Sequence, residues 1–197
     1  MNKQLNEQDY KNAAFDLGVE VAALKAVAEV ESAGDGFLPD GYPKILFEGH
    51  LFSKYTGGVY DKIEPTISYP VWTKEHYLGG KKEYDRLHIA MALGDGTRDA
   101  ALKATSWGKF QILGVNFKDA GYEKVSMFVH DMHISEIQHL KAFVNIIRCW
   151  QLVDALKYLK WEIFARRYNG PGFKKNQYDE KMFEAYMRFK AEERKAV

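Results

Sequence analysis

Apolar residues recur at intervals of three and four along residues 22–32, the pattern of a helix with one buried face. Leu24, Val27 and Ala28 precede Glu31 by seven, four and three residues, so on a helix they share its face. The pattern therefore predicts that Glu31 lies at the end of the buried stripe, in the last turn of the helix.

The other side of the same helix carries charge. Glu29 is about 200° around the axis from the buried stripe and lies over Lys25 and Ala26, so we expect it to be solvated. Gly34 and Gly36 follow and are expected to end the helix with positive φ angles, which would open a cleft beside the last turn.

Helical patterns dominate the rest of the chain. Asn6 is expected to cap a first helix over residues 7–17, which Gly18 ends. Ser126 and Asp154 are expected to cap two later helices, and a short turn is expected to begin at Gly108. Apolar positions cover much of the circumference of residues 134–150, which predicts a central buried helix. Further helices are expected at residues 81–93, 98–105, 115–120, 161–168 and 178–195, with Met182, Tyr186 and Phe189 on the inner side of the last one.

Residues 36–58 have a different pattern, with Pro39, Gly41 and Pro43 at turns and KILFE as the best strand candidate. Residues 59–79 contain two prolines and many aromatic residues, so they are expected to form an ordered excursion without a long helix, of the kind that walls a binding site. We find neither an internal repeat nor a linker, and predict one mainly α domain with a small β element over residues 1–197.

Charge and composition narrow the class of partner. The formal net charge is +1, which argues against nucleic acid as the main partner. Residues 157–197 carry 11 Lys/Arg against 6 Asp/Glu, so the basic C-terminal helix is expected to contact an anionic wall polymer or membrane surface, or else to present a solvated face.

Cys149 is the only cysteine and lies in an apolar run, so it is expected in the core. The first residues lack the apolar core of a signal peptide, and the longest apolar runs are shorter than a membrane span, so the protein is expected in the cytoplasm until something else releases it.

The candidate chemistry begins with Glu31. Partial desolvation and the negative end of the helix dipole both raise a carboxyl pKa, so Glu31 is a candidate general acid. The alternative is a last-turn glutamate exposed to water. Glu48 ends the predicted strand and is a second candidate, as base, nucleophile or electrostatic stabiliser, or as a structural residue with His50 beside it.

Two later segments are candidate ligand contacts. In TSWGKFQILG, Gln111 could hydrogen-bond sugar hydroxyl or acetamido groups. In FARRYNGPGF, Tyr168 and Asn169 could project a phenol and an amide into a cleft, or Asn169 could be a helix C-cap.

A competing cluster is HDMHISEIQH, with His130, Asp131, His133, Glu136 and His139. Its spacing matches none of the zinc-peptidase patterns, and such mixed spacing is typical of a solvated face, so we expect neither a metal nor another cofactor.

Taken in order, VESAGDGF, KILFEGHLF, SWGKFQILG and FARRYNGPGFKKNQYDEKM resemble the N-acetylmuramidase domain of phage endolysins, in the lysozyme-like superfamily with goose-type lysozymes and lytic transglycosylases. The resemblance covers about residues 8–189. It implies a lysozyme-like α+β fold and hydrolysis of the β-1,4 bond between N-acetylmuramic acid and N-acetylglucosamine in bacterial peptidoglycan.

Carried over by position, the resemblance puts the catalytic acid at Glu31. It puts groove-lining contacts at Ser106, Gln111, Tyr168 and Asn169, whereas no role carries over to Glu48, which stays a catalytic candidate. Phe110 and His50 are expected as further substrate contacts. Gly49 stands where a basic residue is expected, which puts a contact to substrate carboxylates there in doubt.

Members of this family often carry a separate wall-binding module, for which this chain is expected to have no room. We therefore expect a monomer with a single domain, acting in the periplasm or cell wall after release from the host cytoplasm. Two alternatives stay open. One is a lytic transglycosylase that leaves 1,6-anhydro ends, and the other is a non-catalytic wall-binding protein that has kept the fold.

Overall fold

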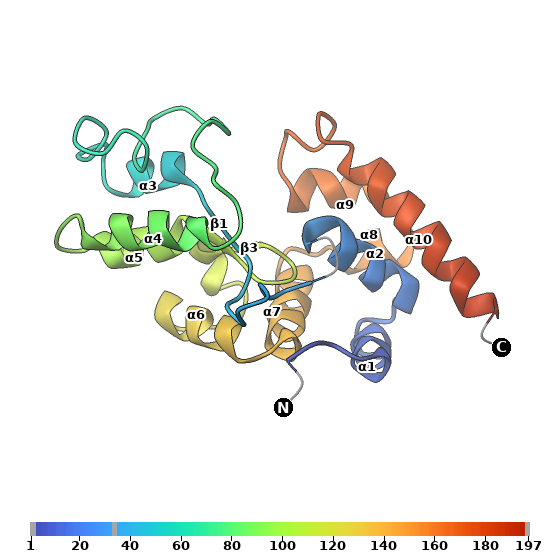
Figure 1. Cartoon of the computed structure of the whole chain (residues 1–197). Coiled ribbons are helices and arrows are strands. Elements are labelled where there is room, and N and C mark those ends of the chain that lie inside the picture. The colour runs from blue at the N-terminus through green and yellow to red at the C-terminus, as the bar shows by residue number, and fades with distance from the viewer. Residues whose placement is uncertain (1–2, 33–34, 196–197) are drawn as a thin grey trace.

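The structure is a computed structural model that describes residues 3–32 and 35–195. Helices occupy most of these residues, and a small antiparallel sheet lies among them (Figure 1). The helices are α1 (Glu7–Leu17), α2 (Val21–Ser32), α3 (Gly49–Tyr55), α4 (Lys82–Ala92), α5 (Thr97–Lys103), α6 (Val125–Ile134), α7 (Glu136–Cys149), α8 (Val153–Lys157), α9 (Trp161–Tyr168) and α10 (Tyr178–Lys195), with a 3₁₀ turn at Gly114–Phe117.

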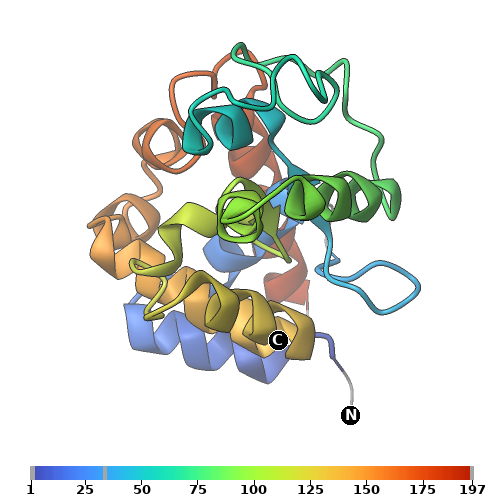
Figure 2. The ribbon, with the colours of Figure 1, turned by 90° about the vertical axis from the view of Figure 1, so that its left-hand side faces the viewer.

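The sheet joins two groups of helices. Its strands are β1 (Ile45–Phe47), β2 (Thr105–Trp107) and β3 (Ile112–Leu113), in the order β1-β2-β3, with Leu46 opposite Ser106 and Ser106 opposite Leu113. In Figure 1, α3, α4, α5 and α6 lie on one side of β1, and α2, α8, α9 and α10 lie on the other. Turned by 90°, the molecule shows α3 above α4 and α5, with α6, α7 and α1 below them (Figure 2).

The expected central helix is confirmed as α7. Phe143, Ile146 and Ile147 are fully buried, and the Phe143 ring stacks on Phe110 with centroids 4.2 Å apart. The helix begins at Glu136 rather than at residue 134, because Ser135 has an extended backbone (φ −165°, ψ 161°) that separates α7 from α6.

Helix α2 is buried more completely than its sequence pattern predicts. Ala26, expected on a solvated face, is fully buried, because α10 packs along α2 and covers that side. The charged residues there are paired: Glu29 with Arg188 of α10, and Lys25 with Glu7 of α1. The alanines of α2 allow this close approach of a second helix.

The first helix and the last two helices have the predicted bounds, and other expectations need correction. Asn6 caps α1 as predicted, accepting hydrogen bonds from the backbone N–H groups of Gln8 and Asp9. The cap positions of α6 and α8 are Lys124 and Leu152 rather than Ser126 and Asp154. Residues 115–120 do not form the expected helix, since only a 3₁₀ turn ending at residue 117 is present.

Two expectations about single residues are also wrong. Cys149 is exposed, because it lies at the end of α7 on the side away from the core. Gly36 does not adopt a positive φ. Its role is close packing, since a Cβ atom there would lie 2.8 Å from Nδ1 of His139. Gly34 lies outside the described residues.

Two ion pairs are buried within the described part of the chain. Arg86 Nη1 lies 2.9 Å from Glu83 Oε2, and Lys109 Nζ lies 3.1 Å from Glu136 Oε2, with all four side chains 6% exposed or less. Among the described helices, no segment combines the length and the apolar character that crossing a membrane requires.

Candidate active site

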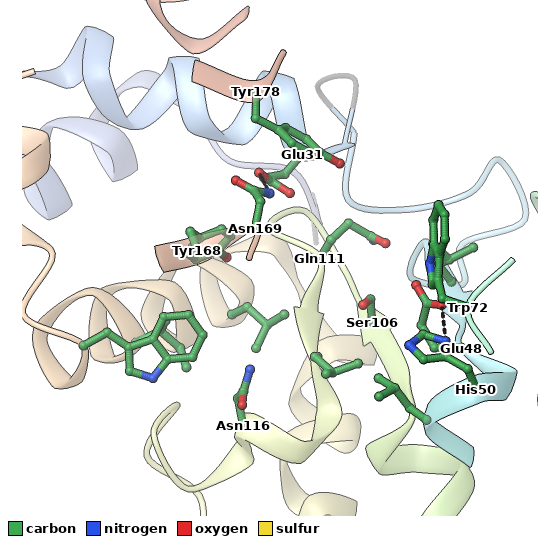
Figure 3. A pocket seen from close by; sticks show the side chains of 16 residues that line it. Glu31, Glu48, His50, Trp72, Ser106, Gln111, Asn116, Tyr168, Asn169 and Tyr178 are labelled. Carbon is green, nitrogen blue, oxygen red and sulfur yellow. Dashed lines mark hydrogen bonds and ion pairs between the residues drawn. The ribbon is translucent and has the colours of Figure 1, made fainter. Parts of the chain in front are cut away.

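The carboxyl groups of Glu31 and Glu48 both face one cleft of about 450 Å³ (Figure 3). Glu31 lies with Asn169 and Tyr178 at one side, Glu48 lies with His50 and Trp72 at the other, and Gln111 and Ser106 come between the two groups. The remaining lining residues are mostly apolar or aromatic: Leu46, Leu51, Ile112, Leu113, Asn116, Ile146, Trp150 and Tyr168.

Glu31 occupies the last turn of α2, as the helical pattern predicts. Its carboxyl accepts a hydrogen bond from Asn169, with Nδ2 and Oε1 2.8 Å apart. Burial raises the pKa of Glu31 to about 7, and the hydrogen bond from Asn169 opposes this only in part. Near neutral pH the carboxyl therefore holds a proton in a substantial fraction of molecules, which is the property that a general acid needs.

Tyr168 and Asn169 come from the C-terminal end of α9. The Tyr168 hydroxyl donates to the carbonyl oxygen of Phe110 at 2.8 Å, and the Tyr168 ring stacks on that of Phe164. Burial and the nearby Glu31 raise the pKa of the Tyr168 phenol well above its usual value, so it stays protonated. This hydroxyl fixes the end of α9 and so places Asn169 against Glu31.

Glu48 follows β1 directly and occupies the N-cap position of α3. The Tyr77 hydroxyl donates to Glu48 Oε2 at 2.6 Å, and Nδ1 of His50 lies 3.3 Å from the same oxygen. Burial, with a smaller contribution from Glu83, raises the pKa of Glu48 above its ordinary value, and the Tyr77 hydrogen bond and the charge of Arg86 oppose this only in part. Burial also lowers the pKa of His50, which favours a neutral imidazole.

The floor of the cleft is the sheet and its turn. Ser106 is on β2, and Gln111 is in the turn before β3 with φ 43°. The side-chain nitrogen Nε2 of Gln111 donates to the backbone carbonyls of Gly108 (2.8 Å) and Lys44 (3.3 Å), which stabilises this turn. The side-chain oxygen Oε1 of Gln111 is then the group that a ligand could engage.

Phe110 does not line the cleft with its ring. The side chain is fully buried against Phe143, and only its backbone carbonyl serves the site, as the acceptor for Tyr168. The expected substrate contact of Phe110 is therefore wrong, because the turn directs the ring into the core. The other candidate residues, Glu31, Glu48, His50, Ser106, Gln111, Tyr168 and Asn169, all line the cleft.

The sequence patterns did not single out several residues of the site. Trp72 and Tyr77 belong to the aromatic excursion at residues 59–79, which was expected to wall a site, although neither residue was named. Three more residues line the cleft: Trp150 at the end of α7, Tyr178 at the start of α10 and Asn116 in the 3₁₀ turn. No local sequence pattern marks them.

The candidate metal cluster is used for structure. Glu136 accepts from the backbone N–H of Leu5 (2.8 Å) and of Gly36 (2.7 Å), and His139 Nδ1 accepts from the N–H of Lys109 (3.1 Å). Asp131 accepts from the Tyr122 hydroxyl. Among residues 3–32 and 35–195, no group of three or more His, Cys, Asp or Glu side chains is arranged to hold a metal ion.

A mostly helical domain with a small antiparallel sheet, and with two partly buried glutamates facing one cleft, defines the lysozyme-like class of glycan-cleaving domains. Within that class, the sequence profile of the N-acetylmuramidase family matches residues 20–190. The chain belongs to the N-acetylmuramidase family.

A solved structure supports the same assignment. The crystal structure of the Burkholderia AP3 phage endolysin superposes with a TM-score of 0.83 at 38% sequence identity, covering 96% of this chain and 73% of that one. A comparison with curated proteins finds no match.

Proposed function

We propose that the protein is an endolysin-type muramidase that hydrolyses the β-1,4 bond between N-acetylmuramic acid and N-acetylglucosamine in peptidoglycan, with Glu31 as the general acid. The N-acetylmuramidase family and the similarity to a phage endolysin support peptidoglycan as the substrate. One observation carries the residue assignment: the Glu31 carboxyl faces the cleft with a pKa raised to about 7.

In the proposed reaction, Glu31 gives its proton to the glycosidic oxygen as the bond from that oxygen to the anomeric carbon breaks. The bonding electrons leave with the oxygen, and positive charge develops on the sugar ring that keeps the anomeric carbon. Glu31 is then a carboxylate, which the hydrogen bond from Asn169 stabilises.

Glu48 is the second group in this proposal. As a carboxylate it would stabilise the developing positive charge, activate a water molecule or capture the anomeric carbon. The Tyr77 hydroxyl and Arg86 favour its ionised form against the effect of burial. Attack by the sugar's own hydroxyl would instead give the 1,6-anhydro end of a lytic transglycosylase.

The test compares Glu31→Gln with the wild type on purified sacculi. Removing a general acid should lower the rate of release of soluble fragments by roughly 100-fold or more. Glu29→Gln is the matched control, since Glu29 lies on the same helix but pairs with Arg188 outside the cleft, and it should keep nearly full activity.

Mass spectrometry of the released fragments then separates the rival functions. Reducing N-acetylmuramic acid ends support the proposal, and 1,6-anhydro ends would establish the transglycosylase. Unchanged lysis by Glu31→Gln would overturn the assignment of the acid, and a wild type that binds sacculi without releasing fragments would be a wall-binding protein.

We also propose that the protein acts as a monomer on the cell wall, after release from the host cytoplasm, and makes a second contact with the anionic wall. The expected basic C-terminal helix needs revision, because α10 carries five acidic and five basic residues. The basic excess lies at residues 157–177, in Lys157, Lys160, Arg166, Arg167, Lys174 and Lys175 against Glu162. We therefore place the wall contact on α9 and the segments beside it.

A further inference from the structure

Trp72 is the large aromatic side chain on the Glu48 side of the cleft (Figure 3). It leaves 47% of its surface exposed, although an indole is among the most favourable side chains to bury. Its neighbour Val71 is 73% exposed but does not line the cleft. The ring of Trp72 thus offers an apolar surface to whatever occupies the cleft.

We infer that Trp72 is a binding platform for one N-acetylated sugar ring of the glycan, stacked on the indole beside Glu48. This inference rests on the proposed function, because it takes the occupant of the cleft to be a glycan strand. It adds a specific subsite that neither the catalytic proposal nor the sequence patterns contain.

The chemistry of the two surfaces matches. A pyranose ring has a face of C–H groups, which packs on a flat aromatic ring, and an edge of hydroxyl and acetamido groups, which needs polar partners. Beside Trp72 the cleft supplies such partners in Glu48, His50 and Ser106. An apolar plane next to a few placed polar groups is the usual composition of a small-molecule subsite.

The segment that carries Trp72 is held in place before any ligand binds. The Lys74 ammonium lies 5.7 Å from the centroid of the Trp72 ring. Further along, the Tyr77 hydroxyl bonds to Glu48, and the N–H groups of Leu78 and Gly79 both donate to the buried carboxylate of Glu83, at 2.7 Å and 3.1 Å.

This anchoring matters for affinity. A surface side chain that is already ordered loses little conformational entropy when a ligand covers it. The same contacts join the platform to the catalytic side of the cleft, since Tyr77 lies five residues after Trp72 and bonds to Glu48. A sugar stacked on Trp72 would therefore be set at a fixed position relative to Glu48.

The experiment measures binding, with hydrolysis suppressed. In a Glu31→Gln background, titration calorimetry with a soluble tetrasaccharide of alternating N-acetylglucosamine and N-acetylmuramic acid gives Kd. Trp72→Ala should raise Kd about tenfold, because a lost stacking contact is worth about 1.4 kcal/mol. Trp72→Phe should raise it less, since a smaller aromatic plane remains.

Val71→Ala is the matched control, as an exposed apolar neighbour in the same segment that does not line the cleft. It should leave Kd unchanged. The platform is overturned if Trp72→Ala binds like its parent, or if Val71→Ala weakens binding as much, which would indicate a general loss of order in the segment.

These outcomes are distinct from those of the catalytic test. If Glu31→Gln still hydrolyses the sugar, calorimetry shows heat from turnover and the acid assignment fails. The comparison of Trp72→Ala with Val71→Ala can then be made with a chitin tetrasaccharide bound to the unmodified enzyme at low temperature. If the wild type is active and the Trp72→Ala variant has an unchanged KM, the binding role of Trp72 is overturned and the proposed function stands.

Discussion

The two carboxyl groups of the cleft differ in what surrounds them. Asn169, a neutral amide, donates to Glu31, whereas Glu48 has the Tyr77 hydroxyl, His50 and the charge of Arg86 nearby. The Tyr77 hydroxyl and Arg86 favour the ionised form of Glu48 while Glu83 opposes it, and Asn169 favours the ionised form of Glu31. Two carboxyl groups with different surroundings can take different roles in one reaction.

The bond from Asn169 to Glu31 gives a prediction about pH. The amide N–H stabilises the carboxylate, so Asn169→Ala should raise the pKa of Glu31 further above its ordinary value. Because the acid must be protonated to act, the loss of kcat/KM at alkaline pH, near 7 in the wild type, should move to higher pH. Initial rates on sacculi, measured over a series of pH values, give the alkaline limb of the pH profile, which is the pH range over which kcat/KM falls.

Asn116→Ala is the control, as another amide that lines the same cleft from the 3₁₀ turn. Its alkaline limb should stay where it is in the wild type. A limb that stays fixed in Asn169→Ala as well would mean that Glu31 is not the group that titrates.

Gly49 stands where a basic residue was expected, and its surroundings give a steric reason for the glycine. It follows Glu48 directly, and a Cβ atom there would lie 2.4 Å from the Tyr69 ring and 2.5 Å from the carbonyl oxygen of Ile67. A larger residue would displace the segment that carries Tyr69. The glycine therefore keeps the wall of the cleft close to the strand that presents Glu48.

At the scale of elements, two buried ion pairs hold the backbone close in sequence to the two carboxyl groups of the cleft. Glu83 accepts from the N–H of Phe47, and Arg86 donates to the carbonyl of Phe47, so the pair holds both sides of the residue before Glu48. Glu136, paired with Lys109, accepts from the N–H of Gly36 beyond the end of α2. These pairs connect α4 and α7 to the segments that carry the chemistry.

Breaking one pair should be costly. Arg86→Met leaves Glu83 buried without its cation, and losing one partner of a buried pair costs about 3–5 kcal/mol. The free energy of unfolding in urea should fall by roughly this amount. The control is Arg148→Met, which breaks the exposed pair with Asp16 and should cost about 1 kcal/mol or less. Equal losses in the two variants would contradict the role of Glu83 and Arg86.

The sequence predicted the helices well where the pattern is local. α1, α9 and α10 have the expected bounds, because a capping box, an amphipathic stripe and the glycines and proline after Tyr168 act within a few residues. β2 and β3 were missed because strands of three and two residues are defined by pairing with β1. Their local pattern is too short to indicate a strand.

The site was predictable in the same uneven way. Glu31 was found because its helix has one apolar face, and Asn169 because a helix end is visible in sequence. Their contact across 138 residues could not be inferred from spacing. The predictions of a solvated Ala26 and a buried Cys149 were wrong for a related reason. Whether another element covers a given helix face, as α10 covers α2, depends on packing between distant segments.

At the scale of the whole molecule, the uneven charge gives a test of wall binding. The triple variant Lys160→Gln, Arg167→Gln and Lys175→Gln removes three charges from the basic segment. It should bind sacculi roughly tenfold more weakly at low salt, with a smaller difference at high salt where such charges are screened. Sedimentation of protein with sacculi at two salt concentrations measures both effects.

The matched control removes three charges from α10, as Lys181→Gln, Arg188→Gln and Lys190→Gln. Two of these side chains already pair with acidic residues, Arg188 with Glu29 and Lys190 with Glu20, so binding should change little. If the control loses binding and the first variant keeps it, the contact lies on α10 after all.

The contact between Glu31 and Asn169 has a consequence for the order of synthesis. The glutamate is made early, but the amide that bonds to it and Tyr178, which borders it, arrive only in the last part of the chain. Until α9 and α10 have docked on α2, water reaches the carboxyl, which then ionises like any exposed glutamate at neutral pH. A chain in which α9 and α10 have not yet packed against α2 thus has no working acid, and competence comes with that packing.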